Sequence, residues 1–487
     1  MSTISTPGSF DLDKSEIWLL PSEEAGGGKP IDILKTGFVG DLTIKENLEN
    51  NFIGVDMSVG DARNIIGNMP IIGGEVITIK LVSTHLDENN PKHVIEQSFR
   101  IDEIINRNYI DDREQTYIIR AVSPEAYKNN TQIISERFTG KPQEIFEDIY
   151  DRFIKEPKVI GDGKNKKDGF PLEFCDISGG QVFKRENFTF VANYWTPYQC
   201  MNFLASKVAP ADAGGKELMP NVKYFQTTKA HYVASLSRLQ AFYKEQNSIY
   251  DEFWYVPTGS DPFMLDEKRK TRGGYGFISP FVSNQYSTMS GLSIPLMTQD
   301  LGDQISGYQG NTTIGFDMTT RLPYHMEFDY SPLQPIRISD NKRVIPSEFK
   351  DFYHLADQTP MRQLPNVNPK SSLNVRIGSS QIWTDQKFGY DWRFLLDTAY
   401  RDTATEELKR LRVKFDVPGR TDIDLGMLVY LNFPNTDEKG DGASEDELFD
   451  ARMSGIYSVI GIKHMFSIAK QHHTMTIDVV RDSMGDF

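Results

Sequence analysis

Short segments near both ends of the chain alternate between apolar and polar residues. The runs Thr116–Arg120 and Met475–Val479 show the alternation over five positions, and the segments around them are rich in Val, Ile, Tyr and Phe. A period of two places every second side chain on the same face of an extended strand. The pattern therefore predicts antiparallel strands that bury one face.

The strands at the start of the chain are matched by strands at its end. In each quarter a strand is followed by a glycine turn and three further strands, in the same order, and both GEV and GML begin with a glycine. The matching segments are 52–60, 74–82, 98–105 and 115–122 in the first set, and 411–419, 426–433, 455–462 and 473–480 in the second. Strands linked by hairpins leave open edges unless the sheet closes. We therefore expect two related small antiparallel β-barrels.

The chain between these strand sets has helical signals. Thr196 and Gln199 form a capping box with Pro197 at the first helical position, and an apolar face follows until Pro210. A second helix begins near Pro142 and presents apolar residues at helical spacing, namely Ile145, Phe146, Ile149, Tyr150 and Phe153. A mixed α/β middle domain is thus expected between the barrels.

Two further segments are assigned before and within the second barrel. Residues 257–280 contain four glycines around a charged run, which predicts a long surface loop. Residues 390–412 lack Gly and Pro and predict a long helix that leads into the second barrel. The expected fold class is α+β, mainly β. The expected domains are 14–130 (first barrel), 131–370 (middle domain, which lends strands to the second barrel) and 371–487 (helix and second barrel).

Composition narrows the class of protein. With 487 residues, 39% apolar and 25% charged, the chain is long enough for more than one core and typical of a globular protein. Its net charge of −15 argues against a protein that grips nucleic acid, but not against one that lets nucleic acid slide past. The start MSTISTPGSF lacks a signal peptide, and no apolar run reaches the ~18 residues of a membrane span. We expect a cytoplasm-like compartment and no membrane insertion.

No motif predicts a catalytic, cofactor-binding or metal site. The run Gly26–Lys29 fails as a phosphate loop, because Pro30 stands where a hydroxyl is needed. Neither G-x-S-x-G nor H-E-x-x-H occurs, and the acidic run 437–447 lacks the closing glutamate of a calcium loop. We assign residues 435–452 to a solvated hairpin tip. A pair of carboxylates working as acid and base stays open, because that chemistry depends on spatial separation.

Histidines and cysteines are also expected to be structural. His472 and His473 are adjacent on a predicted strand and should point to opposite faces. Cys175 and Cys200 lie in no metal or redox motif and are expected to be reduced thiols. The sequence thus predicts a protein without cofactors that is not an enzyme.

The order of barrel, helix-bearing middle and barrel resembles the baseplate hub protein of contractile-tailed, T-even-like bacteriophages. The segments that carry the resemblance are 193–209 (NYWTPYQCMNFLASKVA), 411–434, 454–466 and 473–484, including the "GxxVxLxFP" run. The resemblance covers nearly the whole chain in architecture, but this chain is longer than a compact hub requires. No short motif of the family maps a contact or a catalytic residue onto it.

The resemblance implies a homotrimeric ring in the virion, assembled in the host cytoplasm. Two barrels per subunit would imitate sixfold symmetry and adapt a hexameric tail tube, or its initiator proteins, to a trimeric central spike. Baseplate wedge and tape measure proteins are further implied partners, and genomic DNA would pass through the channel without specific binding. Three alternatives are kept: the hub of a bacterial contractile injection system, a tail-associated enzyme that degrades carbohydrate or cell wall, and an unrelated β-rich binding module. Since the chain stops at Phe487, just past the last predicted strand, we expect no fused needle.

Overall fold

The fold is described from a computed structural model of the chain. The structure describes residues 7–22, 29–68, 71–84, 89–90, 93–177, 180–184, 187–213, 218–246, 251–255, 286–296, 310–317, 322–329, 334–337, 373–378, 397, 400–401, 411–434, 450 and 453–481.

The N-terminal part is a curled antiparallel sheet. Its strand order is β2 (Ile31–Asp32), β1 (Glu16–Leu20), β5 (Val76–Val82), β6 (Val94–Tyr109), β7 (Gln115–Val122), β4 (Gly54–Asp61) and β3 (Val39–Asn47). Every second residue of β4 is buried, as the alternation of its sequence predicts. These side chains fill a core that includes Ile77, Phe99 and Tyr117.

The C-terminal part is a closed barrel of six strands. The ring runs β23 (Gly455–Ser467), β22 (Leu428–Asn432), β15 (Asp251–Tyr255), β16 (Thr288–Leu296), β21 (Leu411–Pro418), β24 (His472–Arg481) and back to β23. Strands β15 and β16 come from the span assigned to the middle domain. They pair in parallel at only two positions, where Trp254 lies opposite Thr288 and Tyr255 opposite Met289. The prediction of a mainly β, α+β fold is confirmed; the domain boundaries stay predictions.

The two β units have equivalent strand orders. The ladders β4–β7, β7–β6 and β6–β5 of the first unit correspond to β21–β24, β24–β23 and β23–β22 of the second. In each unit one more strand flanks each side of this set: β1 and β3 in the first, β15 and β16 in the second. The flanking strand β1 runs antiparallel to β5, whereas β15 runs parallel to β22. The inner four strands therefore carry the duplication.

The correspondence extends to individual backbone atoms. Gly74 and Gly426 each lie two residues before the second strand of their set, with φ of 85° and 82°. The N–H of Gly74 donates to the carbonyl of Ile101 at 3.0 Å, and the N–H of Gly426 donates to that of Val459 at 2.7 Å. A β-bulge directly follows Ile101 in β6 and Val459 in β23. Glycine is needed at both turns because their φ is positive.

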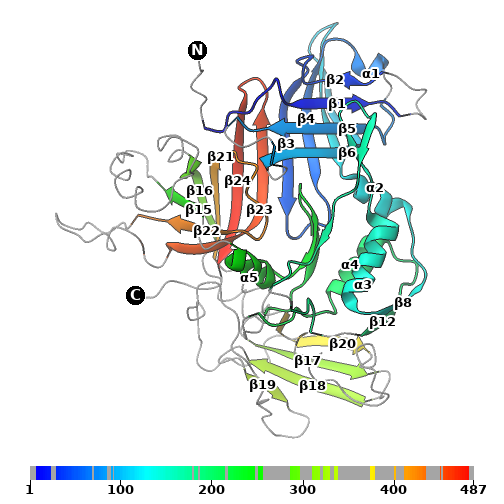
Figure 1. The fold of residues 1–487 in the computed structure, drawn as a ribbon, viewed down its shortest axis with the longest axis vertical. Helices are drawn as coiled ribbons and strands as arrows, with labels where there is room; N and C mark the ends of the chain where they lie inside the picture. Colours follow the sequence, from blue (N-terminus) through cyan, green and yellow to red (C-terminus); the bar gives the residue numbers. More distant parts are fainter. Residues whose placement is uncertain are drawn as a thin grey trace, which may run out of the picture.

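Closure differs between the two units. Both were expected to close, but among the described residues only the C-terminal ring does so through strand ladders. In the first unit the outer edge of β3 is occupied by β23, with residues 41–47 antiparallel to 461–467. Figure 1 shows these blue and red strands side by side. Pairing with the second unit satisfies the edge of β3, so the sheet has no need to close on itself there.

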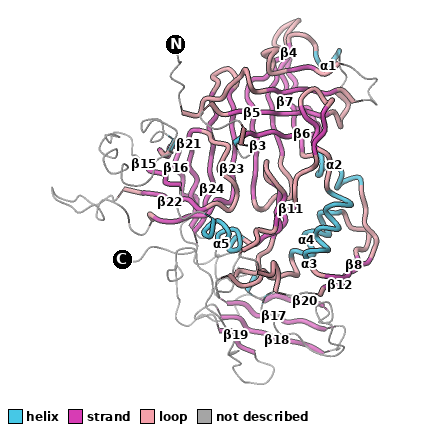
Figure 2. Tube along the Cα trace, in the orientation of Figure 1, coloured by secondary structure: helices cyan, strands magenta, loops and turns pink. Residues whose placement is uncertain are grey.

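Three helices pack along one flank of the molecule. Figure 2 shows α2 (Pro124–Thr131), α3 (Pro142–Ile149) and α4 (Pro197–Ala205) on that flank, with α5 (Leu236–Gln246) apart from them. The capping box of α4 is confirmed, with the N–H of Gln199 donating to Thr196 Oγ1 at 3.3 Å. The helix predicted near Pro142 is confirmed as α3, which continues into the π-helical turn η2 (Tyr150–Ile154).

Short strands complete the structure. A four-stranded sheet in the order β19, β18, β17, β20 lies below the middle part in Figure 1. The bounds of the remaining elements are α1 (Ile65–Asn68), β8 (Arg137–Gly140), β9 (Lys158–Ile160), β10 (Asn165–Lys167), β11 (Leu172–Glu173), β12 (Phe188–Val191), β13 (Lys223–Gln226), β14 (His231–Ala234), β17 (Gly310–Asp317), β18 (Leu322–Asp329), β19 (Gln334–Arg337) and β20 (Leu373–Gly378).

Several predicted segments fall where little is described. The loop 257–280 and the glycines 26–28 lie outside the described residues, and so does the hairpin tip 435–452 except Asp450. Of the predicted helix 390–412, Asp397, Tyr400 and Arg401 are helical, while Leu411 and Arg412 already belong to β21. No helix among the described residues is long and apolar enough to cross a membrane.

Replacing Phe466 with alanine should destabilise the whole chain. Phe466 is 1% exposed and extends from β23 into the core of the first unit, where its ring meets Phe10 edge to face at 5.7 Å. We expect Phe466→Ala to lower the free energy of unfolding by about 3–5 kcal/mol in urea titrations. Phe52→Ala is the matched control, because Phe52 is 40% exposed, and it should cost less than about 1 kcal/mol. Equal effects of the two variants would contradict the shared core.

Candidate functional site

The three parts of the chain meet at a buried cluster of polar side chains, which we call the polar junction. It consists of Glu46 on β3, Thr228 and Lys229 in the turn between β13 and β14, Asp424 before β22, His464 on β23 and His473 on β24. Each part of the chain therefore contributes at least one charged or polar group to the junction.

The strand alternation explains why these groups are buried. Leu42, Ile44 and Glu46 are all buried on the same face of β3. His464 stands between Ile462 and Phe466 on the buried face of β23. A polar residue at an apolar position of the pattern was thus the sequence signal for this cluster, and the sequence analysis missed it.

The two junction histidines form one hydrogen-bonded pair. His464 Nδ1 lies 3.0 Å from His473 Nε2, and His464 Nε2 lies 3.8 Å from Glu46 Oε1. The ring of His473 stacks on Phe466 with centroids 3.9 Å apart. A Cβ on Gly419 would lie within 2.1 Å of the His473 ring, so only glycine fits at position 419. His473 is buried, while its neighbour His472 is half-buried.

Burial disfavours the charged forms of these groups. Desolvation, with the Lys229 charge, lowers the pKa of His464 to about 3, and desolvation, with the neighbouring histidines, lowers the pKa of His473 well below its usual value. Desolvation and the Asp424 carboxylate raise the pKa of Glu46 to about 7. The two histidines are therefore neutral at pH 7, and Glu46 becomes neutral as the pH falls below its pKa, which lowers the cost of burying charge at the meeting point of the three parts.

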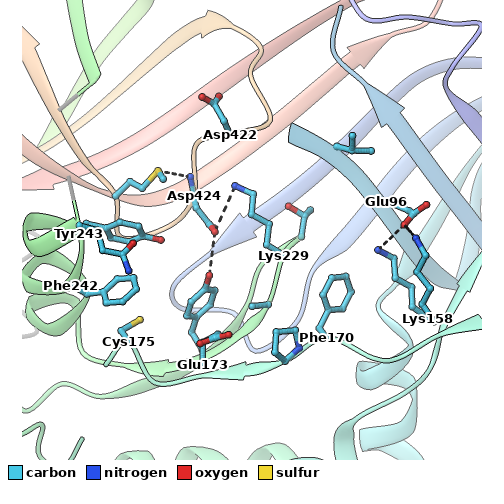
Figure 3. A pocket seen from close by; sticks show the side chains of 18 of the residues that line it. Glu96, Lys158, Phe170, Glu173, Cys175, Lys229, Phe242, Tyr243, Asp422 and Asp424 are labelled. Atoms are coloured by element: carbon cyan, nitrogen blue, oxygen red, sulfur yellow. Dashed lines mark hydrogen bonds and ion pairs between the residues drawn. The ribbon is translucent and has the colours of Figure 1, made fainter. Parts of the chain in front are cut away.

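A cavity of about 650 Å³ lies beside the junction (Figure 3). Asp424 holds one wall, with its Oδ2 atom 3.8 Å from Lys229 Nζ and accepting from the Tyr232 hydroxyl at 3.4 Å. On the opposite side in Figure 3, Glu96 Oε2 lies 3.6 Å from Lys158 Nζ and 2.9 Å from Lys167 Nζ. The cavity is thus walled by paired charges from all three parts.

The described lining of the cavity pairs no hydroxyl or thiol with a histidine base. Burial raises the pKa of the Cys175 thiol, which keeps it protonated. Burial lowers the pKa of Lys158 to about 8, opposed by Glu96. No histidine is among the described lining residues, and the described part of the chain has no group of three metal-ligating side chains. Cys175 and Cys200 are free and buried, as the sequence predicts.

Comparison with known proteins gives fold-level similarity only. No family model and no curated protein sequence matches the chain. A tail protein from Neisseria meningitidis is 9% identical with a TM-score of 0.47, and the match covers 96% of this chain and 97% of that one. A 43 kDa prophage tail protein from Shewanella oneidensis is 11% identical with a TM-score of 0.48, covering 96% and 99%. A type VI secretion component from E. coli is 8% identical with a TM-score of 0.36, covering 92% and 74%.

The polar junction predicts a stability that depends on pH. Below pH 6.5 the unfolded chain binds protons at positions 464 and 473 that the native state does not bind, so the free energy of unfolding falls as the pH falls. Between pH 4.5 and 7 the native state holds a proton on Glu46 that the unfolded chain releases, which gives the opposite slope. Because two histidines oppose one carboxyl group, the net free energy of unfolding should fall as the pH drops below 6.5. It should fall more steeply below pH 4.5, where Glu46 no longer contributes the opposite slope.

Two variants should change this profile in different ways. Glu46→Gln should raise the free energy of unfolding at pH 8 by roughly 1–3 kcal/mol and leave it nearly unchanged at pH 4. His464→Gln should flatten the fall below pH 6.5 without raising stability at pH 8. Urea midpoints measured from pH 4 to 8 check both expectations. If the unmodified protein and the two variants give parallel pH profiles, Glu46 and His464 do not cause the pH dependence.

Proposed function

We propose that this protein is the structural baseplate hub of a contractile phage tail. Three copies form a ring of six related β units that joins a hexameric tail tube to a trimeric central spike and surrounds the DNA channel. One observation carries the proposal: the chain contains two β units with equivalent strand order, equivalent glycine turns and the same bulge. The resemblance of the sequence to phage hubs supplies the biological setting.

Duplication is what a protein between two symmetries requires. A closed ring of three chains presents six similar units on one face, which suits a sixfold partner, while the three chains remain identical and suit a threefold partner. The units are similar rather than identical, since β1 and β15 run in opposite senses against their neighbours. This difference gives the ring its true threefold symmetry.

The charge of the chain fits a channel that does not retain DNA. Each copy has a net charge of −15, so three copies bring −45 in total. A net negative charge repels the phosphates of a duplex rather than neutralising them. DNA can then pass through the channel without being held at a tight binding site.

The proposed partners are the central spike, the tail tube or its initiator, and at the periphery wedge and tape measure proteins. The proposed location is the tail baseplate of the virion, after assembly in the host cytoplasm. The hub of a bacterial contractile injection system shares this architecture, and no observation on the chain favours it over the phage hub.

Copy number tests the proposal. Native mass measurement of the complex with the spike protein should give three copies of this chain for one trimeric spike. The free protein can be monomeric at low concentration, because a partner that spans all three subunits reinforces the ring. Two or six copies per spike would contradict the symmetry adaptor.

The proposed structural role predicts an inactive protein in hydrolysis assays. Purified protein incubated with dye-labelled peptidoglycan or capsule should release no more dye than a heat-denatured control. A pair of carboxylates that acts as acid and base would hydrolyse glycosidic bonds without a nucleophile–histidine pair. Hydrolysis abolished by one Asp→Asn or Glu→Gln change would establish an enzyme instead.

A further inference from the structure

Half of the long strand β6 has an unpaired edge among the described residues. Strand β5 pairs with β6 only as far as Arg100, and Ile101 exchanges hydrogen bonds with Gly74 and Glu75. From residue 102 to 109 the edge away from β7 forms no backbone hydrogen bond with a described residue. This stretch is largely exposed, and Tyr109 at its end is 71% exposed.

Strand β16 has a second unpaired edge. β15 pairs with it only at Thr288 and Met289, so residues 290–296 are joined to β21 on one side alone among the described residues. This stretch, SGLSIPL, carries no charge, and Ile294 is 41% exposed. Native proteins usually protect an exposed edge strand with charged residues, so an uncharged one is expected to have a partner.

The two unpaired edges are the counterparts of two edges that are joined within the chain. In the duplicated arrangement β6 corresponds to β23, and β16 corresponds to β3. Residues 461–467 of β23, which follow the bulge, pair with residues 41–47 of β3. The same part of β6 and the same edge of β16 have no partner in the described chain.

We propose that the edge of β6 at residues 102–109 pairs antiparallel with residues 290–296 of β16 from a second copy of this chain. The contact between copies would repeat the contact β3–β23 between the two units of one chain. The inference rests on the proposed ring for its closure into three copies. Because the edges differ, the contact is head-to-tail, and such contacts close into rings or grow into filaments.

The internal contact fixes the register. Lys45 lies opposite Gly54 in the first unit, and Leu296 lies opposite Arg412, the counterpart of Gly54 in the second unit. Leu296 is therefore the counterpart of Lys45. Within the chain, Lys45 pairs with Lys463. In β6 the counterpart of Lys463 is Ile105. Lys463 lies opposite Thr476, and Ile105 lies opposite Ile118, which is the counterpart of Thr476 in the first unit. Leu296 of one copy therefore falls opposite Ile105 of the next.

A second position gives the same register independently. Thr43 lies opposite Asp56, and Ser293 lies opposite Lys414, the counterpart of Asp56, so Ser293 is the counterpart of Thr43. Within the chain, Thr43 pairs with Met465, and the counterpart of Met465 in β6 is Asn108. Ser293 then falls opposite Asn108. Both correspondences advance by three residues on each strand, so one uninterrupted antiparallel register satisfies them.

Proline 295 is compatible with this register. It falls opposite Asn106, which has a φ of 53° at the second bulge of β6. Proline cannot donate to a ladder and is tolerated at edges and irregular positions. The one residue of β16 that cannot donate would thus face the irregular point of β6.

Disulfide trapping between two differently labelled chains tests the contact. Asn108 and Ser293 are both exposed, so Asn108→Cys and Ser293→Cys should fold. Mixed at high concentration with oxidised glutathione, the two single variants should form a covalent heterodimer, and the double variant should form a covalent trimer. Asn108→Cys mixed with Ser290→Cys is the out-of-register control and should crosslink at least tenfold less, because a disulfide needs Cα atoms within about 7 Å.

Mass measurement separates the contact from the ring. Trimers without the predicted disulfide would overturn the strand pairing and leave the ring standing. Long covalent filaments would support the pairing and contradict the three-copy hub. If no disulfide and no assembly form at high concentration, both the strand pairing and the ring are overturned.

A matched pair of charge variants gives a second readout. Ile294 falls opposite Arg107 in the proposed register, so Ile294→Lys places two cations together and Ile294→Glu places opposite charges together. Ile294→Lys should weaken self-association at least tenfold relative to Ile294→Glu, with equal melting temperatures for the two monomers. Equal self-association of both variants would contradict the register.

Discussion

One bent strand, β23, holds the molecule together. Its first residues pair with β22, its last seven pair with β3, and the bulge after Val459 bends the strand between them. Tyr457 lies in the core of the barrel, while Phe466 lies in the core of the first unit. The two units cannot separate without exposing both the ladder β3–β23 and part of a core, so we expect them to behave as one body.

This joint also determines where polar groups are buried. Glu46 and His464 lie on the two strands that form the joint, and the turn around Lys229 closes over them. Burial shifts the pKa of the glutamate upward and that of the histidine downward, so the histidine is neutral at pH 7 and the glutamate becomes neutral as the pH falls below 7. The joint is then held by hydrogen bonds and packing rather than by a salt bridge, whose desolvation would be costly.

The sequence predicted the local elements and missed the non-local contacts. Alternation fixed the strands around Tyr117 and Ile477, and capping chemistry placed the helix at Pro197, because both depend on neighbours in sequence. The parallel contact of Trp254 with Thr288 joins residues whose pairing no local pattern specifies. The polar junction was missed for the same reason: Glu46 and His464 stand at apolar positions of their strands, but they lie more than 400 residues apart in the sequence.

The central claim is that two equivalent units in each chain form a ring of six around a channel. Averaged electron micrographs of the assembled protein with its spike, viewed along the channel, test this most directly. The account predicts six similar lobes that alternate in detail and repeat exactly three times. Three lobes around the channel with the N-terminal units outside the ring would contradict it.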